Sequence, residues 1–493
     1  MEVKFMKKQI ACLQPVVAHV QTQEQTQELK LPDGFPDIGK ILGCWGQPMI
    51  RSKEWRRTSM NVSGGVMAWV LYMPEEDEIP RVMDAWIPFQ MRWEFPESLD
   101  DGNMLINPIL SNLDARNVSA RKIILRAGVE LMGQAMAAEK VEMTVPVDIP
   151  EDVQLLTQKY PVNIPVEAGE KQIALEDDVA LADANIAVQR MIGYTIAPAV
   201  QEARILANRL VMRGNAHFKM RYMTSDGQMR MYSKEIPFSE YTELDRDYEE
   251  NADTLIVPIL TALEVDLADD MHLMIRGNVA AQYTVFDRTV AEVTEDAYSP
   301  HRDVTVHTEG VNLPVLLDNR KFDVPVSGET AANHPIDIEA FPKQPHLRMD
   351  EDGRMMHLSG GYQTVSTDDG MEMVRFEGDC AYPADEGNQT QLWLGYSTDP
   401  EYKQNADENT ISSVYPVTAL AYSGKAIEMV TGLTLGEVKE ATADKPSIIL
   451  RRANDEGLWA MAKKCGSTMD AIRAANHLEQ EPEEGRMLLI PVV

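Results

Sequence analysis

The sequence predicts a mainly β protein, built from tandem β-rich domains and ending in a small βααβ module. Three observations predict this class. Short motifs recur at an offset of 150 residues, apolar and polar residues alternate between turn signals, and residues 448–491 have the pattern strand, helix, helix, strand. We expect four units: two tandem copies at 1–150 and 151–325, a degenerate third copy at 326–443, and the module at 444–493.

The repeat is carried by several motifs whose spacing is conserved between the first two units. So many pairs at one offset indicate a tandem duplication. A third, more diverged copy is indicated by three further echoes. The pairs of the first two copies are Leu31-Pro-Asp33 with Leu181-Ala-Asp183, Ile87-Pro-Phe89 with Ile236-Pro-Phe238 (one residue deleted), and Pro108-Ile-Leu110 with Pro258-Ile-Leu260. The echoes are Met356–Gly361 with Met60–Gly65, Asp368-Asp-Gly370 with Ser225-Asp-Gly227, and Ile427–Gly432 with Ile123–Gly128.

Within a copy, the dominant period is two. In residues 213–222 the side chains alternate, and Ser225-Asp-Gly227 supplies turn residues, so this segment predicts a β-hairpin. A short helix is expected to open each copy, over Ile38–Leu42 and Ile186–Ile192, each followed by a glycine. The proline-rich segments 145–150, 160–165 and 325–345 are expected on sheet edges or in linkers.

The composition disfavours several classes of partner. The chain has 46 basic and 78 acidic residues, a net charge of −32, which repels nucleic acid and anionic lipid. No stretch approaches the ~18 apolar residues of a membrane span, and Met1–Cys12 lacks the apolar core of a secretion signal. The scattered Cys12, Cys44, Cys380 and Cys465 predict free thiols in a reducing cytosol.

We expect no enzyme, no cofactor and no metal, because the sequence contains no recognisable catalytic constellation. His301, Asp303 and His307 fall on one face of a strand, but without a fourth ligand they predict an exposed edge strand. The other candidates predict turns, strands or solvated surface, because each lacks the flanking residues of a phosphate loop, a calcium loop or an acid–base pair. They are Gly64-Gly65, Asp226, Asp369, and the pair Glu75 and Glu76.

The C-terminal segment resembles a LysM module. Ile448–Arg452 opens it as a strand, Leu458 and Trp459 begin a first helix, a second helix ends at Asn476, and Leu489-Ile-Pro491 closes it. LysM is a binding module, so the resemblance directs attention to recognition. The usual Gly-Asp-Thr before Leu-Trp is here Asp455-Glu456-Gly457, which favours a protein ligand over N-acetylglucosamine.

The preceding copies are similar to SPOCS domains of spore-coat morphogenetic proteins. The similarity lies in Leu31–Leu42, Val62-Ser-Gly-Gly-Val66, Val70-Leu-Tyr72 and Ile87-Pro-Phe89. Tandem SPOCS-type domains with a C-terminal LysM module resemble the SipL-type family. The resemblance implies a cytoplasmic protein of the mother cell at the forespore surface, which docks the SpoIVA-type coat-basement ATPase or another coat protein.

The function predicted is therefore a non-enzymatic scaffold for assembly of the spore coat. Two alternatives stay open: a peptidoglycan-binding LysM adaptor, and a phage-tail or baseplate assembly component. The residues expected at the partner site are Asp455, Glu456, Leu458, Trp459 and Asn476. Leu458 and Trp459 also suit core packing, with an edge of Trp459 left for a partner, and Asn476 suits a left-handed cap of the second helix.

Overall fold

The structure is a computed structural model of the 493-residue chain. The residues it describes are 2–76, 79–184, 186–268, 272–351, 353–366, 370–383, 389–397, 399–404, 408–424, 426–439 and 447–493. Strands account for 74% of the described residues, beside two short helices, so the predicted mainly β class is confirmed.

The first lobe, residues 4–147, consists of two three-stranded antiparallel sheets. Their strand orders are β1-β6-β5 and β2-β3-β4. The apolar faces of both sheets, with side chains such as Val62, Val66 and Leu125, meet in one buried core. The strands are β1 (Lys4–Lys30), β2 (Ile38–Arg56), β3 (Ser59–Pro74), β4 (Arg81–Glu94), β5 (Asn103–Ser119) and β6 (Lys122–Val147).

The second lobe, residues 154–298, repeats this arrangement strand for strand. Its sheets are ordered β7-β12-β11 and β8-β9-β10. β7 begins at Gln154, 150 residues after the start of β1, so the sequence offset is also the offset of equivalent strands. The strands are β7 (Gln154–Ala180), β8 (Arg190–Leu206), β9 (Arg209–Met223), β10 (Met229–Glu243), β11 (Thr254–Ala268) and β12 (His272–Tyr298).

The third lobe, residues 302–438, has the same order of pairing with interrupted strands. β13 with β14 occupies the place of β1, and β21 with β22 occupies the place of β6. Its two sheets are joined where Ser327 of β14 pairs with Glu377 of β18. The strands are β13 (Arg302–Val311), β14 (Leu316–Thr330), β15 (Asp337–Pro342), β16 (His346–Asp350), β17 (Gly353–Ser366), β18 (Gly370–Ala381), β19 (Gln389–Leu394), β20 (Glu401–Lys403), β21 (Asn409–Tyr422) and β22 (Ile427–Val438).

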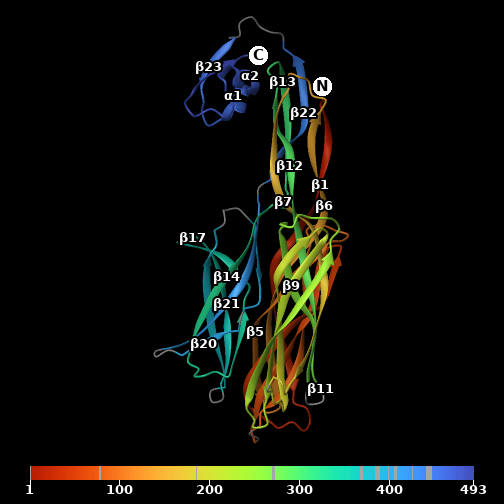
Figure 1. Ribbon diagram of the computed structural model, residues 1–493, viewed down its shortest axis with the longest axis vertical. Helices are drawn as coiled ribbons and strands as arrows, with labels where there is room; N and C mark the ends of the chain where they lie inside the picture. The colour runs from red at the N-terminus through yellow and green to blue at the C-terminus, as the bar shows by residue number, and fades with distance from the viewer. Residues whose placement is uncertain are drawn as a thin grey trace.

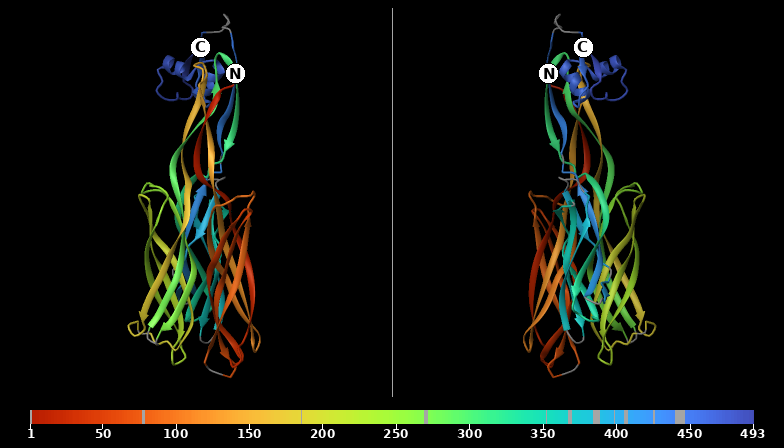
Figure 2. Two further views of the ribbon diagram at one scale, coloured as in Figure 1. Left: turned by 90° about the vertical axis from the view of Figure 1, so that its right-hand side faces the viewer. Right: turned by 90° about the vertical axis from the view of Figure 1, so that its left-hand side faces the viewer.

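A narrow stem rises from the three lobes (Figure 1). It is formed by three two-stranded ribbons, β1 with β6, β7 with β12, and β13 with β22. At about 3.3 Å per residue, a 27-residue strand such as β12 spans roughly 90 Å, long enough to run through both lobe and stem. Apolar residues from all three ribbons, including Val141, Val293 and Met429, fill the stem. Figure 2 shows the three lobes side by side below it.

The chain ends in a βααβ module beside the tip of the stem (Figure 1). β23 (Ile448–Arg452) pairs antiparallel with β24 (Met487–Pro491). Between them lie α1 (Gly457–Cys465) and α2 (Met469–Asn476). The element order expected for residues 448–491 is therefore observed.

The helices expected at Ile38–Leu42 and Ile186–Ile192 are wrong. The first segment lies in β2, and the second is irregular until β8 begins at Arg190. The pairing of β2 with β3 shifts register after Ile38 and again after Ile41, and β8 shifts after Met191. Because each bulge adds a residue to the strand, successive apolar residues are no longer two positions apart, and their spacing resembles that of a helix.

Two of the proline-rich segments lie where they were expected: 160–165 is part of β7, the edge strand of the sheet β11-β12-β7, and 145–150 covers the end of β6 and the connection after it. One further expectation needs correction. The sequence similarity between Ile427–Gly432 and Ile123–Gly128 does not reflect equivalent positions in the two lobes. Ile427–Gly432 pairs with β13 in the stem, whereas Ile123–Gly128 pairs with β1 and β5 within the first lobe. The predicted turn at Asp369 lies outside the described residues.

Candidate functional site

The C-terminal module has its own small core. Both helices pack on one face of the β23–β24 ribbon, and Leu458, Met461, Ile472, Leu488 and Ile490 are buried there. Gly466, with φ of +65°, ends α1 in the left-handed conformation, and the Thr468 hydroxyl accepts from the Ala471 N–H to cap α2. A turn glycine and a hydroxyl cap thus separate two helices that would otherwise run together.

Two of the predicted partner residues have structural roles. Leu458 is fully buried at the centre of the module. The Asn476 amide donates to the carbonyl of Leu489 (2.5 Å) and its oxygen accepts from the Leu489 N–H (2.8 Å), which fastens α2 to β24. The expectation that Asn476 forms the left-handed cap of α2 is wrong. The cap is His477, with φ of +54°, and the Asn476 side chain is engaged with β24.

Trp459 faces the second lobe. Its indole N–H donates to Asp296 (2.8 Å), and its ring packs edge-on against Tyr298 with centroids 4.8 Å apart. Lys463 pairs with the same carboxylate at 2.7 Å, and the Tyr298 hydroxyl donates to the carbonyl of Ser467 at 2.9 Å. Burial raises the pKa of Tyr298 to about 12. These contacts attach α1 to the end of β12, which places Trp459 in an intramolecular interface.

Asp455 and Glu456 lie exposed in the loop before α1. Glu456 accepts from Lys464 (2.6 Å) and Arg451 (3.3 Å), and the Lys464 hydrogen bond keeps its pKa below the usual value. Glu481, which sequence reasoning missed, reaches across from the α2–β24 loop and accepts from the Leu458 N–H (3.1 Å). It thereby satisfies a donor in the first turn of α1, where a carboxylate is favoured. Its only sequence signal is the acidic run after α2.

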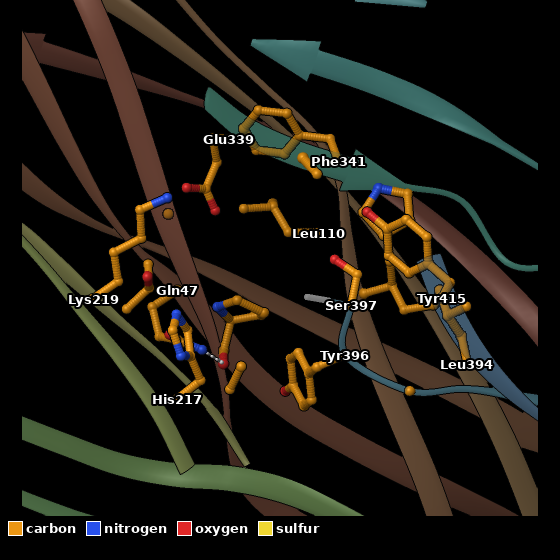
Figure 3. Close-up of a pocket in the computed structure, with 18 of the residues that line it drawn as sticks. Gln47, Leu110, His217, Lys219, Glu339, Phe341, Leu394, Tyr396, Ser397 and Tyr415 are labelled. Atoms are coloured by element: carbon orange, nitrogen blue, oxygen red, sulfur yellow. Dashed lines mark hydrogen bonds between the residues drawn. The ribbon is translucent and has the colours of Figure 1, made fainter. Parts of the chain in front are cut away.

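A second candidate site is a pocket of about 160 Å³ where the three lobes meet (Figure 3). Gln47 of the first lobe, His217 and Lys219 of the second, and Glu339 of the third lie on its polar side. The opposite side carries apolar and aromatic residues: Leu110, Phe341, Leu394, Tyr396 and Tyr415. Sequence reasoning missed this pocket, because its residues come from three distant parts of the chain.

The charged groups that line this pocket are already engaged in ion pairs. His217 contacts Asp399 (3.2 Å) and Glu235 (2.7 Å), and the Asp399 hydrogen bond raises the pKa of His217 to about 9. His217 in turn lowers the pKa of Asp399 to about 2. A histidine that stays protonated near neutral pH is a poor general base. The pair is therefore suited to holding the second and third lobes together.

Beside the pocket, a buried ion cluster joins all three lobes. The Arg221 guanidinium of β9 pairs with Asp337 and Glu339 of β15, and Arg221 and Asp337 are fully buried. The indole N–H of Trp45, from β2, donates to Asp337 at 2.6 Å. Burial opposes the charge on Asp337, but Arg221 and Lys219 hold its pKa below the usual value. Each partner thus compensates a charge that would otherwise be unpaired in the interior.

The residues considered for metal binding do not converge. His301, Asp303 and His307 lie at exposed positions at or along β13, where Asp303 pairs with Lys439. Within the described ranges, no group of three or more His, Cys, Asp or Glu side chains is arranged to hold an ion. Neither of the two described helices reaches the length and apolarity needed to cross a membrane.

No family model, curated protein or solved structure matches this chain.

Proposed function

We propose that this chain is a non-enzymatic scaffold for assembly of the spore coat, and that its C-terminal module docks a SpoIVA-type morphogenetic ATPase. The resemblance of the lobes to SPOCS domains and of residues 448–491 to a LysM module supports this proposal. The three lobes and the stem form an elongated body that carries the module at one end (Figure 1). Such a body suits a protein that positions others.

A protein ligand is favoured over a glycan because the acceptor groups in and around the loop 455–457 are already engaged. In a LysM module this loop helps to line the glycan groove. Here the Glu456 carboxylate is engaged by Lys464 and Arg451, and Glu481 occupies the first turn of α1. These acceptors are thus already used inside the module, which leaves fewer for sugar hydroxyls.

The test is binding of the full chain to immobilised SpoIVA-type ATPase and, in parallel, to purified peptidoglycan. Retention on the ATPase alone is the expected result. Retention on peptidoglycan alone would replace the scaffold by a wall-binding adaptor. Turnover of ATP or of a glycan by the purified chain would remove the non-enzymatic part of the proposal.

A further inference from the structure

The β23–β24 ribbon of the C-terminal module leaves one of its faces bare. The helices cover the face with Leu488 and Ile490, and the residues that alternate with these point away from them. This outer face, as we call it, consists of Ile448, Leu450 and Arg452 on β23 with Met487 and Leu489 on β24. Leu450 stands directly opposite Leu489, and Arg452 stands opposite Met487.

The apolar side chains of the outer face are unusually exposed. Their exposed fractions are 57% for Ile448, 64% for Leu450, 51% for Met487 and 42% for Leu489. Elsewhere, exposed apolar residues such as Leu206 and Val290 stand singly, which is ordinary for a protein surface. On the outer face, four exposed apolar residues lie together on a ribbon of two five-residue strands. They form a contiguous patch, and such patches mark interaction sites.

The charge at one end of the outer face is also unusual. Arg452 stands opposite Met487, and it forms no ion pair within the described part of the chain. Arg486, next to Met487 along β24, points to the helix side, where its guanidinium donates to the carbonyl of Asn476. In a chain of net charge −32, an exposed guanidinium group without a carboxylate partner beside an apolar patch stands out. Arginine is enriched at protein interfaces, where it pairs with carboxylates.

We propose that the outer face is the docking surface of the module, and that it binds a protein partner whose apolar patch is bordered by carboxylates. The inference rests on the proposed function, since the partner is the SpoIVA-type ATPase. It assigns recognition to the side of the module opposite the helices, away from the 455–457 loop. A second copy of the chain is a poorer occupant, because two outer faces would bring unpaired arginines together with no carboxylates to meet them.

The test measures the dissociation constant of the full chain for the ATPase. Leu450→Lys and Leu489→Lys place a charge on the outer face without disturbing the core, and each is expected to weaken binding at least about tenfold. Arg452→Glu is expected to weaken binding by about three- to tenfold and to reduce its dependence on salt. Leu206→Lys and Val290→Lys, at similarly exposed positions on the second lobe, are the matched controls and should bind like the unmodified chain.

The outcomes separate the inference from the function on which it rests. If the unmodified chain binds the ATPase and the outer-face variants bind equally well, the docking surface is wrong and the scaffold function stands. If the unmodified chain does not bind, both proposals fail. If sedimentation shows a dimer of the full chain that Leu450→Lys abolishes, the occupant is a second copy and the proposed partner is overturned. Circular dichroism confirms that each variant is folded.

Discussion

At the residue scale, one glycine explains the most persistent motif of the repeat. Gly64, Gly214 and Gly360 occupy equivalent positions in β3, β9 and β17, and each stands opposite a phenylalanine of the next strand. A Cβ at Gly360 would lie 2.4 Å from the carbonyl oxygen of Phe341 and 2.4 Å from the Phe376 ring. The glycine is required because the neighbouring backbone and an aromatic ring occupy the space of a side chain.

This close approach predicts that Gly360→Ala destabilises the third lobe by about 2–4 kcal/mol, since the backbone carbonyl cannot move aside. The matched control is Gly361→Ala in the same motif, where the nearest atom is the flexible end of Met373 at 3.2 Å. That substitution is expected to cost less than about 1 kcal/mol. Urea unfolding followed by circular dichroism measures both, and equal losses would contradict the steric account.

The His217–Asp399 pair gives a prediction for pH. Because the folded pKa of His217 is raised to about 9, its contribution to stability is complete below its ordinary value of 6.5. It is lost as the pH rises from 6.5 to 9. The side chain is partly exposed, so we expect a loss of about 1–2 kcal/mol, well below the full value of the shift.

The control for this prediction is His217→Asn, which keeps a polar side chain but does not titrate. Its unfolding free energy should change less between pH 6.5 and 9 than that of the unmodified chain. Equal pH dependence in the two proteins would show that the pair contributes nothing. On the acid side, Asp399 is expected to lose its contribution between pH 4 and 2, because its folded pKa is about 2.

At the element scale, the end of β12 decides how the C-terminal module is held. The Asp296 carboxylate accepts from both Trp459 and Lys463, and Tyr298 packs on the Trp459 ring. An interface of a few polar contacts and one aromatic pair is small beside the cores of the lobes. The module is therefore expected to loosen without unfolding the lobes.

Asp296→Ala removes the shared acceptor and should weaken the attachment of α1 by about 1–2 kcal/mol. Hydrogen exchange is expected to become faster in residues 457–465, which contact β12, while β3 and β9 keep their protection. The control is Asp303→Ala, which breaks the exposed stem pair with Lys439. If Asp296→Ala leaves the exchange of residues 457–465 unchanged, the module is held by other contacts.

At the scale of the whole molecule, the junction of the three lobes depends on buried charge. Arg221, Asp337 and Trp45 come from three different lobes and meet in the interior. The Arg221 guanidinium also lies 5.2 Å from the centre of the Trp45 ring. Such a cluster penalises any arrangement of the lobes that leaves one charge without its partners, so it favours a single arrangement.

Arg221→Met should therefore lower the stability of the lobe junction by about 3–5 kcal/mol, because Asp337 then remains buried with only Lys219, at 3.3 Å, to balance its charge. Calorimetry is expected to show the third lobe unfolding separately from the first two. The control is Arg116→Ala, which breaks an exposed pair with Asp114 and should cost less than about 1 kcal/mol. A single unfolding transition with unchanged midpoint in Arg221→Met would contradict this role.

The sequence by itself determined the features that depend on local pattern. Alternation and turn residues predicted the β class, the 150-residue offset located equivalent strands of the first two lobes, and the C-terminal pattern predicted the order βααβ. It misplaced the opening helices, because bulges in β2 and β8 shift the apolar spacing.

Only the tertiary structure decided what depends on residues far apart in the chain. Which face of β23–β24 stays bare, where Trp459 packs, and how Arg221 meets Asp337 across 116 positions follow from the docking of lobes and ribbons. The physical reason is that a side-chain period shows which residues share a face. What covers that face is decided by surfaces that come together only when the whole chain has folded.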